Sequence, residues 1–97
     1  MKEMDKLNTE NLEEVSGGFR NGQWMTVHGL QPADYLIVRS GPEATQATEI
    51  GGLCNGDDVQ IAGGTVVGTD VGGPAMYVYV YVPKFGLNGY VNVDFIW

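Results

Sequence analysis

The hydrophobic pattern divides the chain into an opening with helical periodicity and a remainder with strand periodicity. Within residues 1–18, four aliphatic side chains fall on one side of a helix at about 100° per residue. These are Met4, Leu7, Leu12 and Val15. Asn8 is placed to cap a helix that begins at Thr9, and Gly17-Gly18 would end it. The opening is therefore predicted to be a short helical or flexible segment.

From residue 19 onward, the apolar positions recur with the period of a β-strand. The clearest case is 76–82, where Val78, Val80 and Val82 share one face and three tyrosines share the other. Those tyrosines are Tyr77, Tyr79 and Tyr81. Other strands are expected at 23–27, 35–39, 49–53, 59–61 and 89–91, and there is room for one more at 65–67. The pattern predicts an all-β domain of five to seven short antiparallel strands.

Glycine, proline and asparagine mark the connections between these strands. Asn55-Gly56-Asp57 is a tight-turn signal that needs a positive φ. Residues 43–48 are polar and predict a loop. The stretch 62–75 is rich in glycine and predicts either a flexible excursion or a hairpin. If this stretch folds over the three tyrosines, it would bury them as a second small core.

Length and charge restrict the classes of function. The 79 residues from 19 to 97 suffice for one small domain with a single core. The formal net charge of the chain is −7, which excludes nucleic acid and anionic membranes as partners, because both attract clusters of Lys and Arg. No apolar run approaches the roughly 20 residues that span a bilayer, so membrane insertion is not expected. The N-terminus also lacks the pattern of a general secretory signal, so export would need a dedicated machine.

The opening segment resembles the double-glycine leader of bacteriocin-type precursors. The resemblance rests on the order and spacing of Leu7, Asn8, Glu10, Leu12, Val15, Gly17 and Gly18. It implies that a peptidase-containing ABC transporter recognises the four aliphatic positions, cuts after Gly18 and exports the remainder. A cleft too narrow for side chains would admit a diglycine, which gives the motif a physical reason. The alternative is an ordinary amphipathic helix that ends in a Gly-Gly link.

Three spaced motifs beyond the leader resemble the bacterial SH3-like domain. They are Tyr35-Leu36-x-Val38-Arg39-Ser40-Gly41-Pro42, Ile50-x-x-Leu53-x-x-Gly56-Asp57-x-Val59-x-Ile61 and Asn88-Gly89-Tyr90-Val91-x-x-Asp94-Phe95-Ile96. The resemblance implies a small SH3-like barrel whose last strand runs into a short turn and a terminal strand. It divides the chain into a leader at 1–18, a linker at 19–23 and a barrel at 24–97 with a Gly-rich insertion at 62–75.

Catalytic chemistry finds little support in the sequence. His28 is the single histidine, and no residue around it has the spacing of a metal site. Cys54 is the single cysteine and is expected to be a small buried hydrophobic residue. A Cys54–His28 dyad stays open, because such partners need only be close in space. The sequence predicts a protein that is not an enzyme and holds no metal and no cofactor.

Aromatic side chains make up the expected ligand surface. If the valines of 76–82 point into the barrel, the three tyrosines between them form an outer stripe that can stack on sugar rings or flat peptide faces. The SH3-like resemblance implies ligand contacts near the first strand and the final turn. The candidate ligand-binding residues are therefore Tyr35, Tyr77, Tyr79, Tyr81, Tyr90 and Asp94. Arg39 is expected to pair with a nearby carboxylate.

Together the two resemblances imply an exported, non-enzymatic binding domain that is made in the bacterial cytoplasm as a precursor and then secreted or held at the cell surface. The expected ligand is cell-wall peptidoglycan or its peptides. Two other functions stay open, namely a secreted bacteriocin-like effector and a cytosolic protein-interaction module. Inhibition of neighbouring strains without wall binding would indicate the effector, and the lack of a species that starts at Phe19 would indicate the cytosolic module.

Overall fold

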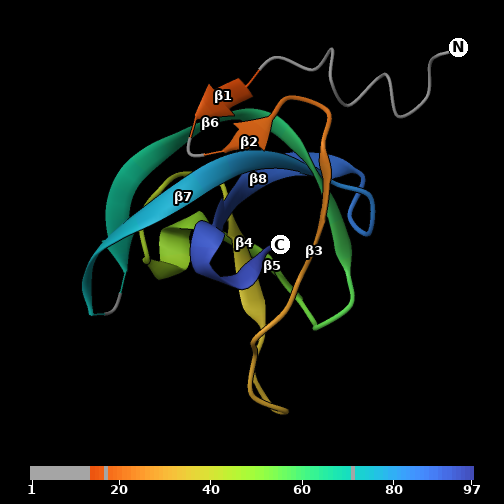
Figure 1. Ribbon diagram of the computed structural model, residues 1–97. Helices are drawn as coiled ribbons and strands as arrows, with labels where there is room; N and C mark the ends of the chain where they lie inside the picture. Colours follow the sequence, from red (N-terminus) through yellow and green to blue (C-terminus); the bar gives the residue numbers. More distant parts are fainter. Residues whose placement is uncertain (1–13, 17, 71) are drawn as a thin grey trace, which may run out of the picture.

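The computed structural model describes residues 14–16, 18–70 and 72–97, and this part of the chain is all-β. Six strands form an antiparallel sheet in the order β3-β6-β7-β8-β4-β5, which curls into a half-barrel (Figure 1). They are β3 (Trp24–Thr26), β4 (Leu36–Arg39), β5 (Glu49–Leu53), β6 (Asp58–Asp70), β7 (Gly73–Val82) and β8 (Leu87–Asn92). Two 3-10 turns, η1 (Gln46–Thr48) and η2 (Val93–Phe95), interrupt the connections. This architecture confirms the predicted small all-β, SH3-like barrel.

The C-terminal residues close the barrel beside β3. Asn92 caps η2, because its side-chain oxygen accepts a hydrogen bond from the Asp94 N–H at 2.9 Å. After this turn the chain runs antiparallel to 26–28, and Thr26 and Trp97 exchange backbone hydrogen bonds of 3.2 and 3.1 Å. The expected last strand and short turn are therefore present, whereas the expected terminal strand is reduced to an isolated β-bridge between Val27 and Ile96.

Alternating burial along the strands produces the core. Val78, Val80 and Val82 on β7 have no exposed surface, and the side chains between them lie on the outer face. Full burial of one such side chain stabilises the fold by roughly 1.5–3 kcal/mol. The other members of the core are Val27, Leu36, Val38, Leu53, Val59, Ile61, Val91 and Ile96. The period-two pattern thus correctly assigns the inner face of β7.

The Gly-rich stretch 62–75 extends the sheet instead of forming a flexible excursion. β6 continues to Asp70 and β7 begins at Gly73, so the two strands form one long hairpin that includes the strand expected at 65–67. The pairing register shifts between Ile61 and Thr65. Near the tip, the Thr69 N–H donates to the Pro42 carbonyl at 3.1 Å, which docks the hairpin on the loop after β4.

The residues just before and after the diglycine differ from their predicted structure. Glu14–Ser16 form β1, which pairs with β2 (Phe19–Arg20), so Val15 lies in a strand and the helix prediction is wrong for 14–16. The reason is local. Ser16 pairs with Phe19 in an antiparallel hairpin, and Gly18, just before Phe19, has a φ of +86°. Met4, Leu7, Leu12 and Gly17 lie outside the described residues.

The stretch 19–23, expected to be a linker, is tied to the sheet. It includes β2, and the Gly22 N–H donates to the Ile61 carbonyl at 2.7 Å. Phe19 packs against the core from its partly buried position. The folded domain therefore includes the residue that would become the N-terminus after cleavage at Gly18.

The Asn55-Gly56-Asp57 turn forms as predicted, with Gly56 at a φ of +95°. Asp57 closes it, because its carboxylate accepts a hydrogen bond from the Cys54 N–H at 2.9 Å and pairs with Lys84 at 3.0 Å. The backbone hydrogen bond from Cys54 is the main cause that lowers the pKa of Asp57 below its ordinary value of 3.8, and Lys84 acts in the same direction. Cys54 itself is exposed, so its expected burial is wrong, because the turn points its side chain away from the core.

Replacing Asp57 by alanine is expected to lower the free energy of unfolding by about 1 kcal/mol at pH 7, because the Cys54 N–H loses its acceptor. A lowered folded-state pKa stabilises the fold above pH 3.8, and this contribution is lost as the pH falls through the folded value. The difference between wild type and variant should therefore shrink at pH 2.5. Urea titrations at both pH values check this, with Lys84→Ala as the control: it removes only the exposed ion pair and should destabilise the fold less than Asp57→Ala does. An equal difference at both pH values would contradict the account.

Candidate ligand groove around Tyr35

The six predicted ligand residues fall into three different environments. Tyr35 precedes β4 and is 61% exposed, and Asp94 is exposed in η2. Tyr77 is 2% exposed. The remaining three, Tyr79, Tyr81 and Tyr90, are half-buried on the outer face of β7 and β8. The continuous stripe expected on β7 is thus interrupted at its first tyrosine.

Tyr77 is a structural residue inside the curled β6–β7 hairpin. Its hydroxyl donates to the Thr69 carbonyl at 2.8 Å, and burial raises the pKa of this hydroxyl above its ordinary value of 10.0. Asn92 lies opposite Tyr77 on β8 and donates to Asp70 at 3.2 Å. The Gly-rich stretch therefore folds over the stripe at this one position, and Tyr77 cannot serve as an exposed ligand contact.

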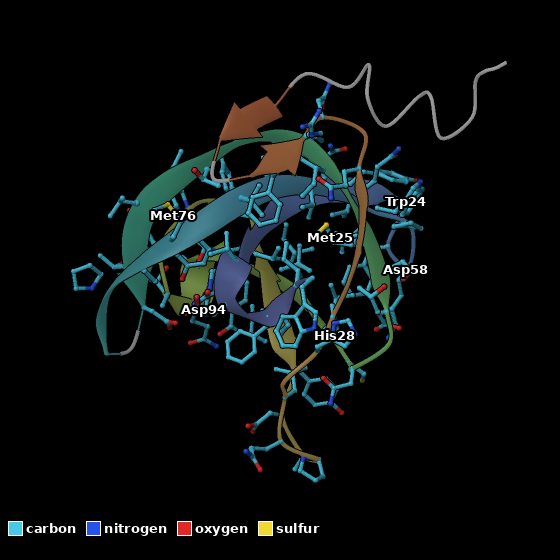
Figure 2. The ribbon with its side chains drawn as sticks, in the orientation of Figure 1. Trp24, Met25, His28, Asp58, Met76 and Asp94 are labelled. Carbon is cyan, nitrogen blue, oxygen red and sulfur yellow. The ribbon has the colours of Figure 1, made fainter. Side chains whose placement is uncertain are left out.

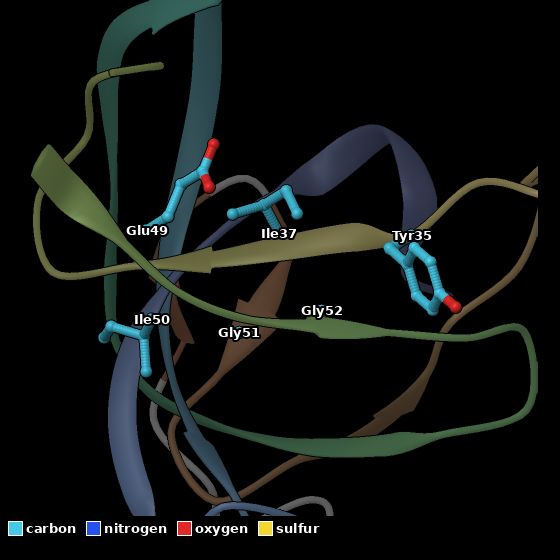
Figure 3. A pocket seen from close by; sticks show the side chains of 6 residues that line it. All are labelled: Tyr35, Ile37, Glu49, Ile50, Gly51 and Gly52. Atoms are coloured by element: carbon cyan, nitrogen blue, oxygen red, sulfur yellow. The ribbon is translucent and has the colours of Figure 1, made fainter. Parts of the chain in front are cut away.

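Tyr35 lines a hollow of about 370 Å³ on the outer side of β4 and β5 (Figure 3). Tyr35 and Ile50 lie at opposite ends of it, and Gly51 and Gly52 lie between them. A Cβ on Gly52 would lie 2.9 Å from the Tyr35 Cβ, so the absence of a side chain lets the tyrosine lie over the strand. Ile50 is 39% exposed. The hollow is thus a shallow aromatic and aliphatic groove with a glycine floor.

Two further hollows adjoin the same tyrosine. One, of about 330 Å³, is lined by Tyr35, Phe95, Leu36, Asp34 and residues 29–31. The other is smaller, about 110 Å³, and has a polar end at Arg39, Asp70, Tyr77 and Asn92. Phe95 of η2 lines both, so the fold brings the start of β4 next to the final turn. We call the three hollows together the Tyr35 groove.

The charges at the Tyr35 groove favour a neutral or cationic ligand. Asp34 and Glu49 are exposed acidic residues that line its two larger hollows. Arg39, 8% exposed, donates to the Thr45 carbonyl at 3.0 Å and to the Thr48 hydroxyl at 3.2 Å. This cation therefore serves to hold the loop after β4. With a net charge of −7 on the whole chain, the groove attracts amines more than carboxylates.

Asn55 positions one wall of the groove from a distant turn. Its side-chain oxygen accepts from the Leu30 N–H at 3.1 Å, and its amide donates to the Leu30 carbonyl at 3.0 Å. The sequence pattern did not predict this role, and it did not predict that Ile50, Gly51 and Gly52 line the groove. A pair of glycines within a strand was the available signal, because glycine there marks a close approach of another group.

His28 and Cys54 lie in different environments, since the histidine is partly buried against Trp97 and the cysteine is exposed. The His28 ring stacks on Trp97 with a centroid distance of 4.6 Å and an interplanar angle of 14°. Its Nδ1 is buried and has no hydrogen-bond partner, so Cys54 does not bond to this nitrogen. Within residues 14–16, 18–70 and 72–97, no three His, Cys, Asp or Glu side chains are grouped so that they could hold a metal ion.

Comparisons with known proteins give no further assignment. No protein-family model matches the sequence, and neither the curated proteins nor the solved structures provide a significant match. None of the helical segments in the described part of the chain has the length and apolar character needed to cross a membrane.

Proposed function

We propose that this chain is an exported, non-enzymatic bacterial SH3-like domain that binds cell-wall peptidoglycan through its peptides. A peptidase-containing ABC transporter would recognise residues 1–18, cut after Gly18 and release a domain that starts at Phe19. Secretion or retention at the cell surface follows from this route.

The observation that carries the binding proposal is the Tyr35 groove. It combines an exposed aromatic ring, a stretch of strand at Gly51 and Gly52 that carries no side chain, and the exposed carboxylates of Asp34 and Glu49. Stem peptides of the wall bear amino groups as well as carboxylates, and their amino groups suit the acidic side chains of Asp34 and Glu49. Tyr35 is also the most exposed of the predicted aromatic site residues, with 61% of its surface exposed.

The export proposal is supported by the place of the cleavage point. Gly18 is exposed, and an added Cβ would meet nothing within 4 Å. It lies in the connection between β1 and β2, outside the six-stranded sheet. Cleavage there removes a three-residue strand and leaves every strand of the barrel intact.

Replacing Tyr35 by alanine is expected to weaken the binding of soluble muropeptides at least about tenfold, because loss of the ring removes on the order of 1.4 kcal/mol or more of contact energy. Isothermal titration calorimetry with purified muropeptides measures this change. Met76→Ala is the matched control, since Met76 is 42% exposed on β7 and does not line the groove. Equal affinities of Tyr35→Ala and wild type would show that the groove is not the binding site.

A further inference from the structure

A second surface of the barrel carries a row of alternating aromatic and amide side chains. Trp24 of β3 pairs with Gln60 of β6, Gln60 pairs with Tyr81 of β7, and Tyr81 pairs with Asn88 of β8. Directly paired residues of an antiparallel sheet project to the same side. We call these four residues the Trp24 row.

The Trp24 row faces outward. The residues that flank it along the strands, such as Val59, Ile61, Val80 and Val82, are buried in the core, so its members project to the opposite side. Trp24 is 56% exposed and Asn88 is exposed. Figure 2 shows Trp24 at the outer edge of the sheet, while its neighbour Met25 points into the barrel. None of the four residues lines the Tyr35 groove.

The spacing of the row matches a chain of sugar rings. Neighbouring strands lie about 4.8 Å apart, so the two aromatic residues, two strands apart, are separated by about 10 Å. Alternate rings of an extended β-1,4-linked glycan could therefore stack on Trp24 and Tyr81, with the amides beside the intervening sugar. The Gln60 amide donates to the Gly22 carbonyl at 3.1 Å, which fixes its plane, and a carboxamide still has a second N–H and an acceptor oxygen.

A second pair of tyrosines extends the same face. Tyr79 and Tyr90 are direct partners on β7 and β8, with ring centroids 5.0 Å apart and tilted by 55°. Gly63 lies against Tyr79, since a Cβ there would be 3.1 Å from the tyrosine Cβ. The missing side chain lets Tyr79 lie close to β6 at this position.

We infer that the Trp24 row is a second binding site whose ligand is a neutral β-1,4-linked glycan chain. The row itself carries no charge, and the acidic chain around it repels anionic polymers. Aromatic rings bind the apolar faces of sugars, and the amides bind their hydroxyl groups. The inference rests on the proposed function in one respect, namely that the polymer comes from the cell wall. The residues of the Trp24 row are separate from the Tyr35 groove.

The experiment uses the β-1,4-linked tetramer of N-acetylglucosamine, which contains no peptide and so does not probe the Tyr35 groove. Trp24 and Trp97 are the two tryptophans of the chain, so Trp97→Phe leaves Trp24 as the sole tryptophan, which can be excited selectively over the tyrosines. Titration of this full-length variant should give a saturable change in Trp24 emission. In the wild-type background, Trp24→Ala and Tyr81→Ala should each weaken the tetramer affinity at least tenfold by calorimetry, and Trp24→Phe should lose less.

Tyr35→Ala is the matched control, and it should leave tetramer binding unchanged while it weakens muropeptide binding. A Trp24→Ala variant that binds the tetramer as wild type does would overturn the inference. Absence of any saturable binding would overturn it too, even if muropeptides still bind at the groove. Sedimentation velocity tests a third outcome, in which the wild-type chain is a dimer and Trp24→Ala is a monomer. If the wild type also fails to bind the tetramer, the row is a self-association surface and the glycan assignment is overturned.

Discussion

Replacing Gly18 by leucine is expected to abolish the secreted species that starts at Phe19, because a peptidase cleft that admits a diglycine cannot accept a branched side chain. The substitution leaves the barrel in place, since Gly18 lies between β1 and β2 and an added Cβ meets no neighbour within 4 Å. Its φ of +86° makes leucine unfavourable at the turn, but this strain stays within the two-stranded hairpin. Mass spectrometry of culture supernatant and cell pellet measures the processed and unprocessed forms.

The control for this prediction is Gly72→Leu, which places the same side chain on an exposed glycine in the connection between β6 and β7. It should be processed and released as wild type is. Circular dichroism of both variants checks that each retains the barrel. Release of Gly18→Leu at wild-type levels with cleavage at the same bond would refute the processing proposal.

Replacing Gly68 by alanine is expected to lower the free energy of unfolding by about 3 kcal/mol, because the added methyl group has no room. The new Cβ would overlap the Pro42 carbonyl, which is backbone and cannot rotate away. The hairpin tip would have to leave the loop after β4, with loss of the hydrogen bond from Thr69 to Pro42. For a domain of this size the melting temperature should fall by roughly 15 °C.

Gly72→Ala is the matched control for stability, since nothing lies within 4 Å of its added Cβ. It should change the free energy of unfolding by less than about 0.5 kcal/mol. Thermal and urea denaturation of the two variants give the comparison. A Gly68→Ala protein as stable as Gly72→Ala would show that the hairpin tip does not pack on Pro42.

Local patterns along the sequence predicted most of the barrel. β5 has the predicted bounds of 49–53, because a turn signal follows it and a polar loop precedes it. The inner face of β7 follows from strict alternation, since one phase of a strand must enter the core. The Asn55-Gly56-Asp57 turn needs a positive φ at its centre, and a glycine between Asn and Asp is the residue pattern that supplies one.

Features that depend on contacts between distant parts of the chain could not be predicted from local sequence patterns. Tyr77 has the same sequence pattern as Tyr79 and Tyr81, and only the curl of the β6–β7 hairpin, docked on Pro42, buries it. The helical spacing before the diglycine was a weak pattern of four aliphatic residues, and pairing with Phe19 and Arg20 gave 14–16 a strand partner instead. The groove likewise depends on contacts between β4, β5 and η2.

The central claim is that the Tyr35 groove receives a wall peptide, and titration of the ¹⁵N-labelled chain with purified muropeptides tests it most directly. The account predicts saturable amide shifts at Ile37, Gly51 and Gly52, together with Leu30 and Phe95 across the groove. Amides at the tip of the β6–β7 hairpin, such as Gly68, should stay unchanged. Saturable shifts confined to residues outside the groove would contradict the claim. The absence of any shift at millimolar muropeptide would contradict it as well.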